Sequence, residues 1–311
     1  MNLEDRLTHA RCALEGLSVG DAFGELFFRH RTAIARFWLQ RNSDRLSLGD
    51  LDRPLDPPPW RWTDDTAMAI AVVETLRERG EIDRNDLANR FAVRYTAEPR
   101  RGYGPAMHRL LPQLRRRNAW QTEPRQLFGG QGSFGNGAAM RVAPVGAYFA
   151  DDLQAAIENA RRSAEVTHAH PEGIAGAIAV AAATALAWQL RGSSKPQPQE
   201  FLDRILFMIP NSEVAFKTQL ARDLQTNTTI RIAATMLGNG SEVTAQDTVP
   251  FVLWSAAHHL DNYESALWHT ASGLGDMDTT CAMVGGIVVM YTGIEGIPVE
   301  WLNNREPLPE P

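Results

Sequence analysis

The segment from Gly173 to Leu190 carries no charged residue and constrains the fold more than any other part of the chain. It is nearly long enough to span a membrane. Its commonest residue is alanine, however, and alanine provides little hydrophobic drive for insertion. We therefore expect a helix buried inside an all-helical protein, with no membrane partner.

Helical periodicity recurs along the chain, whereas strand patterns are almost absent. Between Leu3 and Leu17, apolar residues fall three or four apart on one helix face, which Gly20 is expected to end. The other helices are expected at 67–76, 154–166, 172–190, 200–208, 213–237, 248–260 and 282–290. Residues 41–60 contain a proline triplet and are typical of a surface loop.

Alternating runs of β-branched and aromatic residues between turns are not found, and no internal repeat has a fixed period. We predict a single all-α domain over residues 1–302, built from about ten or more helices. The polar, proline-rich segment 303–311 is expected to fray.

Charge and cysteine content restrict the partners and the compartment. The net charge is −6, and the densest basic run, Arg115–Arg117, is interpreted as a solvated helix face. This argues against a nucleic-acid partner. The N-terminus is charged throughout and does not resemble a signal peptide. With only Cys12 and Cys281 in the chain, we expect no disulfide framework and a cytoplasmic location.

Two distant stretches, TDDT at 63–66 and GDMDTT at 275–280, each place two carboxylates and two hydroxyls at the start of an apolar helix. Taken singly, each could be a helix cap with acids that complement the helix dipole. Taken together, the four carboxylates would repel one another strongly unless cations neutralised them. Hard oxygen ligands favour Mg²⁺, Mn²⁺ or Ca²⁺ over zinc.

The glycine-rich stretch FGGQGSFGNGAAMR at 128–141 matches G-x-G-x-x-G at Gly130, Gly132 and Gly135. No strand precedes it, so a dinucleotide-binding fold is not supported. A glycine loop that leads into a helix can still cradle phosphates with backbone N–H groups. Phe128 and Phe134 could hold a base there or could be core residues.

The stretch THAHPEG at 167–173 contains His168 and His170. The spacing allows a zinc interpretation, but His170 precedes proline and no third soft ligand is nearby. A hydrogen-bonding or packing histidine is the favoured interpretation.

These motifs together resemble the ADP-ribosylglycohydrolase family. The likeness runs from GLSVGDAFG (16–24) through TDDT, GYGPA (102–106), GSFGNGAAMR and THAHPEG to GDMDTT, nearly the whole chain. The resemblance implies an all-α orthogonal bundle with a cleft that holds two Mg²⁺ ions, with Mn²⁺ as the alternative. The metal ligands that it implies are Thr63, Asp64, Asp65, Asp276, Asp278 and Thr279.

The resemblance also implies where ADP-ribose binds. The family's phosphate loop falls on Gly132, Ser133, Gly135 and Asn136, with Phe134 and Phe128 near the adenine. His168 matches a histidine that touches the ribose, and Gly104 lies in the matching GYGPA motif.

The expected activity is hydrolysis of the bond between ADP-ribose and an acceptor, with an ADP-ribosylated protein as substrate, arginine as the first acceptor and ADP-ribose as product. Asp65 or Asp278 is the expected proton acceptor. The alternatives are a module that binds ADP-ribose without cleaving it, or a hydrolase of serine-linked or nucleic-acid-linked ADP-ribose. In several relatives a mobile glutamate stands seven residues after the GD aspartate, but here that position is Phe28 and the nearest acid is Glu25.

Overall fold

All regular secondary structure is helical in the computed structural model, which describes residues 1–30, 45–51 and 55–309. The α-helices are α1 (Leu3–Leu26), α3 (Asp64–Arg79), α4 (Arg84–Ala97), α5 (Met107–Gln113), α6 (Glu123–Gly130), α7 (Ala143–Tyr148), α8 (Leu153–Glu165), α9 (Pro171–Gln189), α10 (Pro198–Leu206), α11 (Glu213–Asp223), α12 (Ile230–Leu237), α13 (Ala245–His258), α14 (Tyr263–Ala271), α15 (Met277–Thr292) and α16 (Val299–Asn304). The 3₁₀ helices are η1 (Phe27–His30), η2 (Leu48–Asp50), η3 (Ala119–Gln121), η4 (Asn136–Ala138) and η5 (Ile294–Gly296). Within those ranges strand pairing is limited to two isolated bridges, which confirms the all-α prediction.

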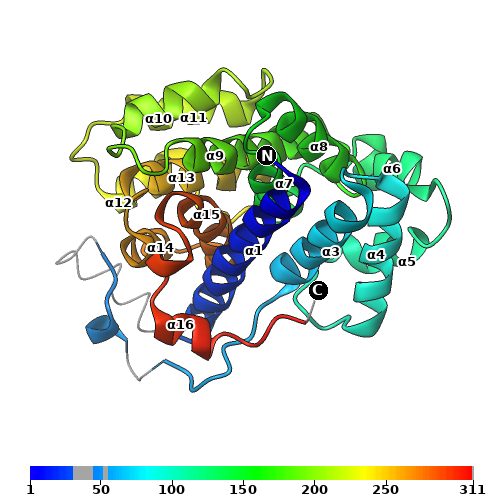
Figure 1. Ribbon diagram of the computed structural model, residues 1–311, viewed down its shortest axis with the longest axis horizontal. Helices are drawn as coiled ribbons and strands as arrows, with labels where there is room; N and C mark the ends of the chain where they lie inside the picture. Colours follow the sequence, from blue (N-terminus) through cyan, green and yellow to red (C-terminus); the bar gives the residue numbers. More distant parts are fainter. Residues whose placement is uncertain (31–44, 52–54, 310–311) are drawn as a thin grey trace.

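Helix α1 runs through the middle of the molecule, and the other helices surround it (Figure 1). Helices α3, α7 and α15 pack directly against it, and α9 packs on α7 and α15. Helices α4, α5 and α6 lie together on the side of α3 that faces away from α1. Helices α10 and α11 lie along the side of α9 that faces away from α1 (Figure 1). The first and last long helices of the chain, α1 and α15, are therefore neighbours at the centre.

Backbone contact between α1 and α15 is closest at Gly20 and Gly24. A Cβ atom at Gly20 would lie 2.1 Å from the carbonyl oxygen of Cys281, and one at Gly24 would lie 2.2 Å from that of Met277. No side chain fits at such distances, so glycine is required at both positions. Close approach of the two helices brings Asp21, beside Gly20, next to the N-terminus of α15.

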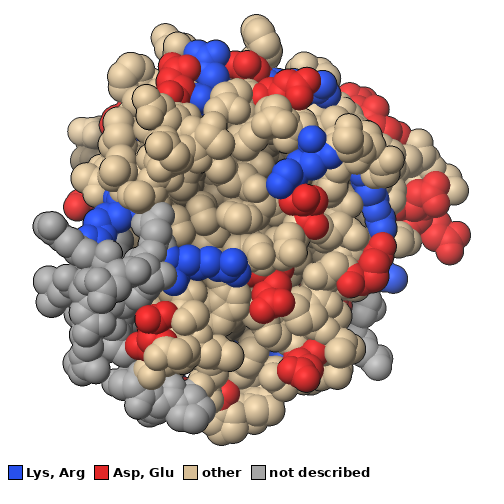
Figure 2. Space-filling view, turned by 90° about the vertical axis from the view of Figure 1, so that its left-hand side faces the viewer, with Lys and Arg blue, Asp and Glu red and all other residues tan. Residues whose placement is uncertain are grey.

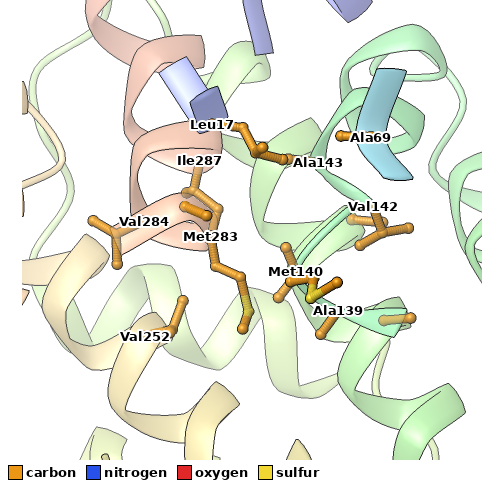
Figure 3. Close-up of a cluster of buried hydrophobic side chains, with 14 of the residues drawn as sticks. Leu17, Ala69, Ala139, Met140, Val142, Ala143, Val252, Met283, Val284 and Ile287 are labelled. Carbon is orange, nitrogen blue, oxygen red and sulfur yellow. The ribbon is translucent and has the colours of Figure 1, made fainter. Parts of the chain in front are cut away.

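The core around this contact is apolar and contains many small residues. Leu17 of α1 lies beside Ala143 at the start of α7, and the side chain of Met283 of α15 extends between Val252 of α13 and Met140 (Figure 3). The residues of Figure 3 are buried, as the side chains of a close-packed interior are. A tightly packed centre fixes the starts of α3 and α15 relative to α1.

Helix α9 has the length and apolar composition of a membrane span, but 78% of its most apolar window is buried inside the protein. It contacts α7, α8, α13 and α15. The prediction of a buried helix at 172–190 is confirmed.

Two expectations about helix ends are wrong. Gly20 does not end α1, which continues to Leu26, because packing against α15 outweighs the cost of about 1 kcal/mol for glycine in a helix. The expected helix at 213–237 is two helices, since the segment 224–229 is not helical and the Thr229 side chain caps α12 by accepting from the Ile232 backbone N–H. Within the expected loop at 41–60, residues 41–44 and 52–54 lie outside the described residues.

The expected fraying from residue 303 does not begin there. The carbonyl oxygen of Asn304 accepts from Trp60 N at 2.6 Å, and Glu306 N donates to Trp60 O at 2.8 Å. Arg305 is buried, and Glu306 forms an ion pair with Arg101. These contacts hold 304–306 against the segment that leads into α3, while the domain boundary at 302 stays a prediction.

Substitution of Gly20 by alanine tests the glycine contact. A new Cβ must push α1 away from α15, so we expect the free energy of unfolding to fall by about 3 kcal/mol, the upper part of the range for overpacking. Gly104→Ala is the control, because no atom lies within 4 Å of its Cβ position. Urea denaturation measures both, and equal stability of the two variants would contradict the contact.

Candidate functional site

A cavity of about 610 Å³ opens where α3 and α15 begin. Its lining contains every residue that the sequence singles out for the site except Thr63 and Gly132. These lining residues are Asp64, Asp65, Gly104, Phe128, Ser133, Phe134, Gly135, Asn136, His168, Asp276, Asp278 and Thr279. Segments that are more than 200 residues apart in the chain thus meet in one cavity.

Three carboxylates from three helices converge at the cavity floor, where Asp65 and Asp278 belong to the lining and Asp21 is fully buried beneath it. Asp21 of α1, Asp65 of α3 and Asp278 of α15 each offer an oxygen atom, and these atoms lie within 4.8 Å of one another. Asp21 and Asp65 are buried and Asp278 is half-buried. Such a set of hard oxygen atoms could hold a metal ion.

Asp21 links α1 to the start of α3. Its carboxylate accepts hydrogen bonds from Thr63 N at 2.9 Å, Thr63 Oγ1 at 2.9 Å, Thr66 N at 3.1 Å and Thr66 Oγ1 at 2.5 Å. It therefore satisfies backbone N–H groups at the N-terminus of α3 that have no partner within the helix. With both oxygen atoms engaged, Asp21 is better suited to position α3 than to hold a cation alone.

Asp65 carries the clearest sign of a missing partner. Its Oδ2 faces the hydroxyl of Thr63 at 3.0 Å and that of Thr279 at 3.5 Å. Its Oδ1 is buried and has no hydrogen-bond partner among the residues that the structure describes. A buried carboxylate oxygen without a donor is costly, and a cation would satisfy it.

Burial and mutual repulsion raise the carboxyl pKa values at this floor. Burial, opposed by hydrogen bonds from Thr66 and Thr63, raises the pKa of Asp21 to about 6. Burial and then Asp21 raise the pKa of Asp64 to about 8. Burial and neighbouring aspartates raise the pKa of Asp65 and of Asp278 well above the usual range. The site therefore binds protons unless a cation takes their place.

Asp276 stands at the N-cap position of α15 but makes no capping hydrogen bond through its side chain. Its Oδ2 instead accepts from Asn136 Nδ2 at 2.7 Å. The amide of Asn136 also contacts Thr248 Oγ1 at 3.2 Å. This hydrogen bond ties the glycine-rich loop to the start of α15, whose first turn carries Asp278 of the acidic floor.

The loop 132–136 is shaped by its glycines and by the neighbouring segment 243–245. Gly132 has a φ of 78°, and a Cβ there would lie 2.9 Å from His170 N. Asn136 N donates to Val243 O, and Ala245 N donates to Phe134 O. Within the described ranges, the backbone N–H groups of Ser133 and Phe134 have no acceptor. Two such N–H groups beside a cavity are suited to binding an anion.

Phe128 and Phe134 line the cavity and form an aromatic pair. Their ring centroids are 6.0 Å apart, and Phe128 is 55% exposed. Phe128 has a φ of 52°, which is strained for a residue with a bulky side chain. An exposed aromatic ring held by a strained backbone at a cavity wall is suited to stack on a planar ligand.

His168 is oriented by a buried chain of hydrogen bonds. Arg141 Nη2 donates to Thr167 Oγ1 at 2.8 Å, and that hydroxyl lies 2.7 Å from His168 Nδ1. Thr167 Oγ1 accepts from Arg141, and among the described residues its own proton has no acceptor other than His168 Nδ1, so we assign the proton of His168 to Nε2. Burial lowers the pKa of His168 to about 3, which keeps the ring neutral. Nε2–H is then a hydrogen-bond donor at the cavity.

A second cavity of about 490 Å³ adjoins the first, and Gly102 and Asp278 line both. Thr63 and Glu25 line this second cavity. Glu25 is half-buried, and Phe28 packs against the core instead of occupying the cavity lining.

Asp21, Arg141 and Thr167 were not singled out by sequence reasoning. Asp21 is the one charged residue in the small-residue stretch GLSVGDAFG at 16–24, and this is the signal that could have identified it. Arg141 and Thr167 stand inside the quoted motifs, but only the folded chain shows that they meet His168.

Comparisons with known proteins agree with this geometry. The sequence profile described as ADP-ribosylglycohydrolase matches residues 2–309. ADP-ribosylhydrolase ARH3 of Homo sapiens is 30% identical over 96% of this chain and 90% of that protein. ARH3 of Xenopus tropicalis is 32% identical over 95% of this chain and 90% of that protein.

Two further matches extend the comparison. ADP-ribosylarginine hydrolase Tri1 of Pseudomonas putida is 28% identical over 96% of this chain and 74% of that protein. A solved structure named ADP-ribosylglycohydrolase-related protein complex superposes with a TM-score of 0.61 at 23% identity, over 97% of this chain and 94% of that one. The latter likeness concerns the fold alone. The family resemblance predicted from the motifs is confirmed.

The raised carboxyl pKa values predict how a metal ion affects stability. A raised pKa stabilises the metal-free fold fully below about pH 3.8, and that contribution is lost as the pH rises through about 6 for Asp21 and about 8 for Asp64. Because a cation competes with these protons, the rise in melting temperature caused by Mg²⁺ should be larger at pH 8 than at pH 6. Thermal melts in Mg²⁺ and in EDTA measure this, and a rise that does not grow with pH would contradict a cation site.

The tautomer of His168 depends on Thr167. Thr167→Val removes the proton donor to Nδ1, so we expect a mixture of tautomers, whereas Thr167→Ser should keep the Nε2–H form. Loss of the acceptor for buried Arg141 should also lower stability by about 1–3 kcal/mol. Imidazole ¹⁵N spectra and urea denaturation measure the two effects. Thr184→Val is the control, because that buried hydroxyl donates to Val180 O within α9. An unchanged His168 spectrum in Thr167→Val would contradict the hydrogen-bond chain from Arg141 through Thr167 to His168.

Proposed function

The chain belongs to the ADP-ribosylglycohydrolase family, and on that basis we propose that it hydrolyses the glycosidic bond between ADP-ribose and an acceptor side chain. The observation that carries the proposal is the acidic floor of Asp21, Asp65 and Asp278 beside a loop with free backbone N–H groups. One end of the cavity suits cations and ribose hydroxyls, and the other suits phosphates. ADP-ribose is the product, and an ADP-ribosylated protein is the substrate.

The metal ions that we propose are two Mg²⁺, with Mn²⁺ as the alternative. The unpaired Oδ1 of Asp65 and the raised carboxyl pKa values support a cation at this floor. The proposed ligands are Thr63, Asp64, Asp65, Asp276, Asp278 and Thr279, with Asp21 orienting Thr63. When bound, the ions would polarise the ribose hydroxyls and lower the pKa of a water.

The remaining residues bind and orient ADP-ribose. Ser133 N and Phe134 N donate to the diphosphate, and Gly132 allows the loop to pass close to His170. Gly135 and Asn136 hold the loop on the acidic floor, and the rings of Phe128 and Phe134 take the adenine. His168 Nε2–H donates to a ribose oxygen near the scissile bond. Gly104 leaves open space on the opposite wall, where no atom lies within 4 Å of its Cβ position.

Proton transfer falls to Asp65 or Asp278. Both residues line the cavity, and burial and neighbouring aspartates raise the pKa of each carboxyl group, which makes its ionised form a stronger base. An oxocarbenium-like transition state develops positive charge at the anomeric carbon, and the carboxylates of the floor stabilise it. Presence of the whole acidic set supports an enzyme over a module that only binds ADP-ribose.

Arginine is the acceptor that we propose first. The name of the Pseudomonas putida relative specifies ADP-ribosylarginine, whereas the names of the ARH3 relatives specify no acceptor. We also propose a cytoplasmic location, because Cys12 and Cys281 are both free thiols.

Removal of one floor carboxylate should separate chemistry from folding. We expect Asp278→Ala and Asp65→Asn to lose at least about 10²-fold in kcat while they stay folded, since each change relieves repulsion among the remaining acids. Asp261→Ala, a surface residue paired with Lys195, is the control and should keep full activity. Release of ADP-ribose from arginine-linked, serine-linked and oligonucleotide-linked substrates is measured in Mg²⁺, Mn²⁺ and EDTA. Turnover that persists in EDTA or in both variants would refute the proposed metal-dependent mechanism.

A further inference from the structure

The second cavity shares part of its wall with the candidate active site, but no residue of the loop 132–136 belongs to its lining. Asp278 and Gly102 line both cavities, and Thr63 lies on the second side. Ser133, Phe134 and Phe128 line the first cavity alone. If ADP-ribose occupies the first cavity as proposed, its scissile bond lies at the shared aspartate. The acceptor that leaves would then occupy the second cavity.

Several charges of the second cavity are already neutralised. Arg29 forms an ion pair with Asp56 at 2.7 Å. Arg101 is buried, pairs with Glu98 and Glu306, and stacks on Trp62 with its guanidinium carbon 3.6 Å from the ring centroid. These groups build the wall and leave little net charge for a ligand.

Two basic side chains at the rim are not neutralised in this way. Arg61 and Arg100 line the cavity and are exposed, and within the described part of the chain neither forms a hydrogen bond or an ion pair. Glu25 is the half-buried acid of the lining and likewise forms no hydrogen bond or ion pair there; burial raises the pKa of its carboxyl group, and the nearby Arg29 and Arg61 only partly oppose that rise. The cavity thus has an acid in its wall and two free guanidinium groups at its mouth.

We propose that the second cavity binds the acceptor segment of the substrate, and that Arg61 and Arg100 select a segment with acidic residues beside the modified side chain. This inference rests on the proposed function. The modified side chain passes Glu25 to reach Asp278. A guanidinium group of the substrate beside Glu25 can form an ion pair with its carboxylate. The flanking residues remain at the mouth, where aspartate or glutamate pairs with the free arginines.

An acidic peptide fits these observations better than a nucleic acid. The chain has a net charge of −6, and on the face shown in Figure 2 basic and acidic side chains are interspersed without a continuous basic area. Two free arginines match two carboxylates, but a nucleic acid needs a longer basic track.

The test compares two ADP-ribosylated arginine peptides that differ only in their flanks, one with aspartate and glutamate and one with lysine. For the wild-type protein, kcat/KM should be at least about tenfold higher for the acidic peptide at low salt, and the ratio should shrink as salt is added. In Arg61→Glu/Arg100→Glu the ratio should fall to one or below. The control is Arg115→Glu/Arg117→Glu, an equal charge change at exposed arginines that line a different cavity.

Affinity for free ADP-ribose, measured by calorimetry, should be the same in all three proteins, because the rim arginines lie outside the first cavity. If the double variant fails to fold, Arg61→Gln/Arg100→Gln and the salt dependence of the wild-type ratio give the same comparison. Hydrolysis by the wild type without flank preference would overturn this inference alone. Preference for an ADP-ribosylated oligonucleotide, lost in the rim variant, would also overturn it. Release of ADP-ribose from none of these substrates would overturn the proposed function and this inference together.

Discussion

Contact between the backbones of α1 and α15 is the constraint on which the rest of the structure depends. Gly20 and Gly24 allow the two helices to approach until a methyl group would overlap a carbonyl oxygen of α15. A wider separation would carry Asp21 away from Asp278, and the carboxylates would no longer converge within 4.8 Å. The same approach fixes the start of α3, because Asp21 accepts hydrogen bonds from Thr63 and Thr66. The fold therefore holds mutually repelling acids together through apolar packing and glycine contacts elsewhere.

The bond between Asn136 and Asp276 joins the two ends of the candidate site. This hydrogen bond joins the loop 132–136 to Asp276 beside the acidic floor, so a displacement of either one shifts the other. Any ligand that orders the loop will favour the arrangement of Asp276 found here, and a cation at the floor will favour the same arrangement of the loop. By linkage, each must then strengthen the binding of the other by the same factor.

Sequence patterns predicted much of this molecule because local rules decided it. The helix-forming composition of α3, α8 and α9 and the capping threonine before α3 are local features, and these helices lie where the sequence predicted them. Gly20 was misjudged because propensity disfavours glycine in a helix, whereas tertiary contact requires it. Asp21 and the Arg141–Thr167–His168 chain depend on which helices become neighbours, and spacing along the chain does not contain that information.

The positions of the acidic-floor residues along the chain also determine when each of them becomes available during translation. Asp21 is synthesised before Asp65, and more than 200 further residues follow Asp65 before Asp278 is added. Because α1 packs mainly against α15, it lacks its main neighbour until α15 has been synthesised. Contacts between such distant segments form slowly. The nascent chain therefore leaves the small-residue face of α1 uncovered by its main neighbour until α15 has left the ribosome.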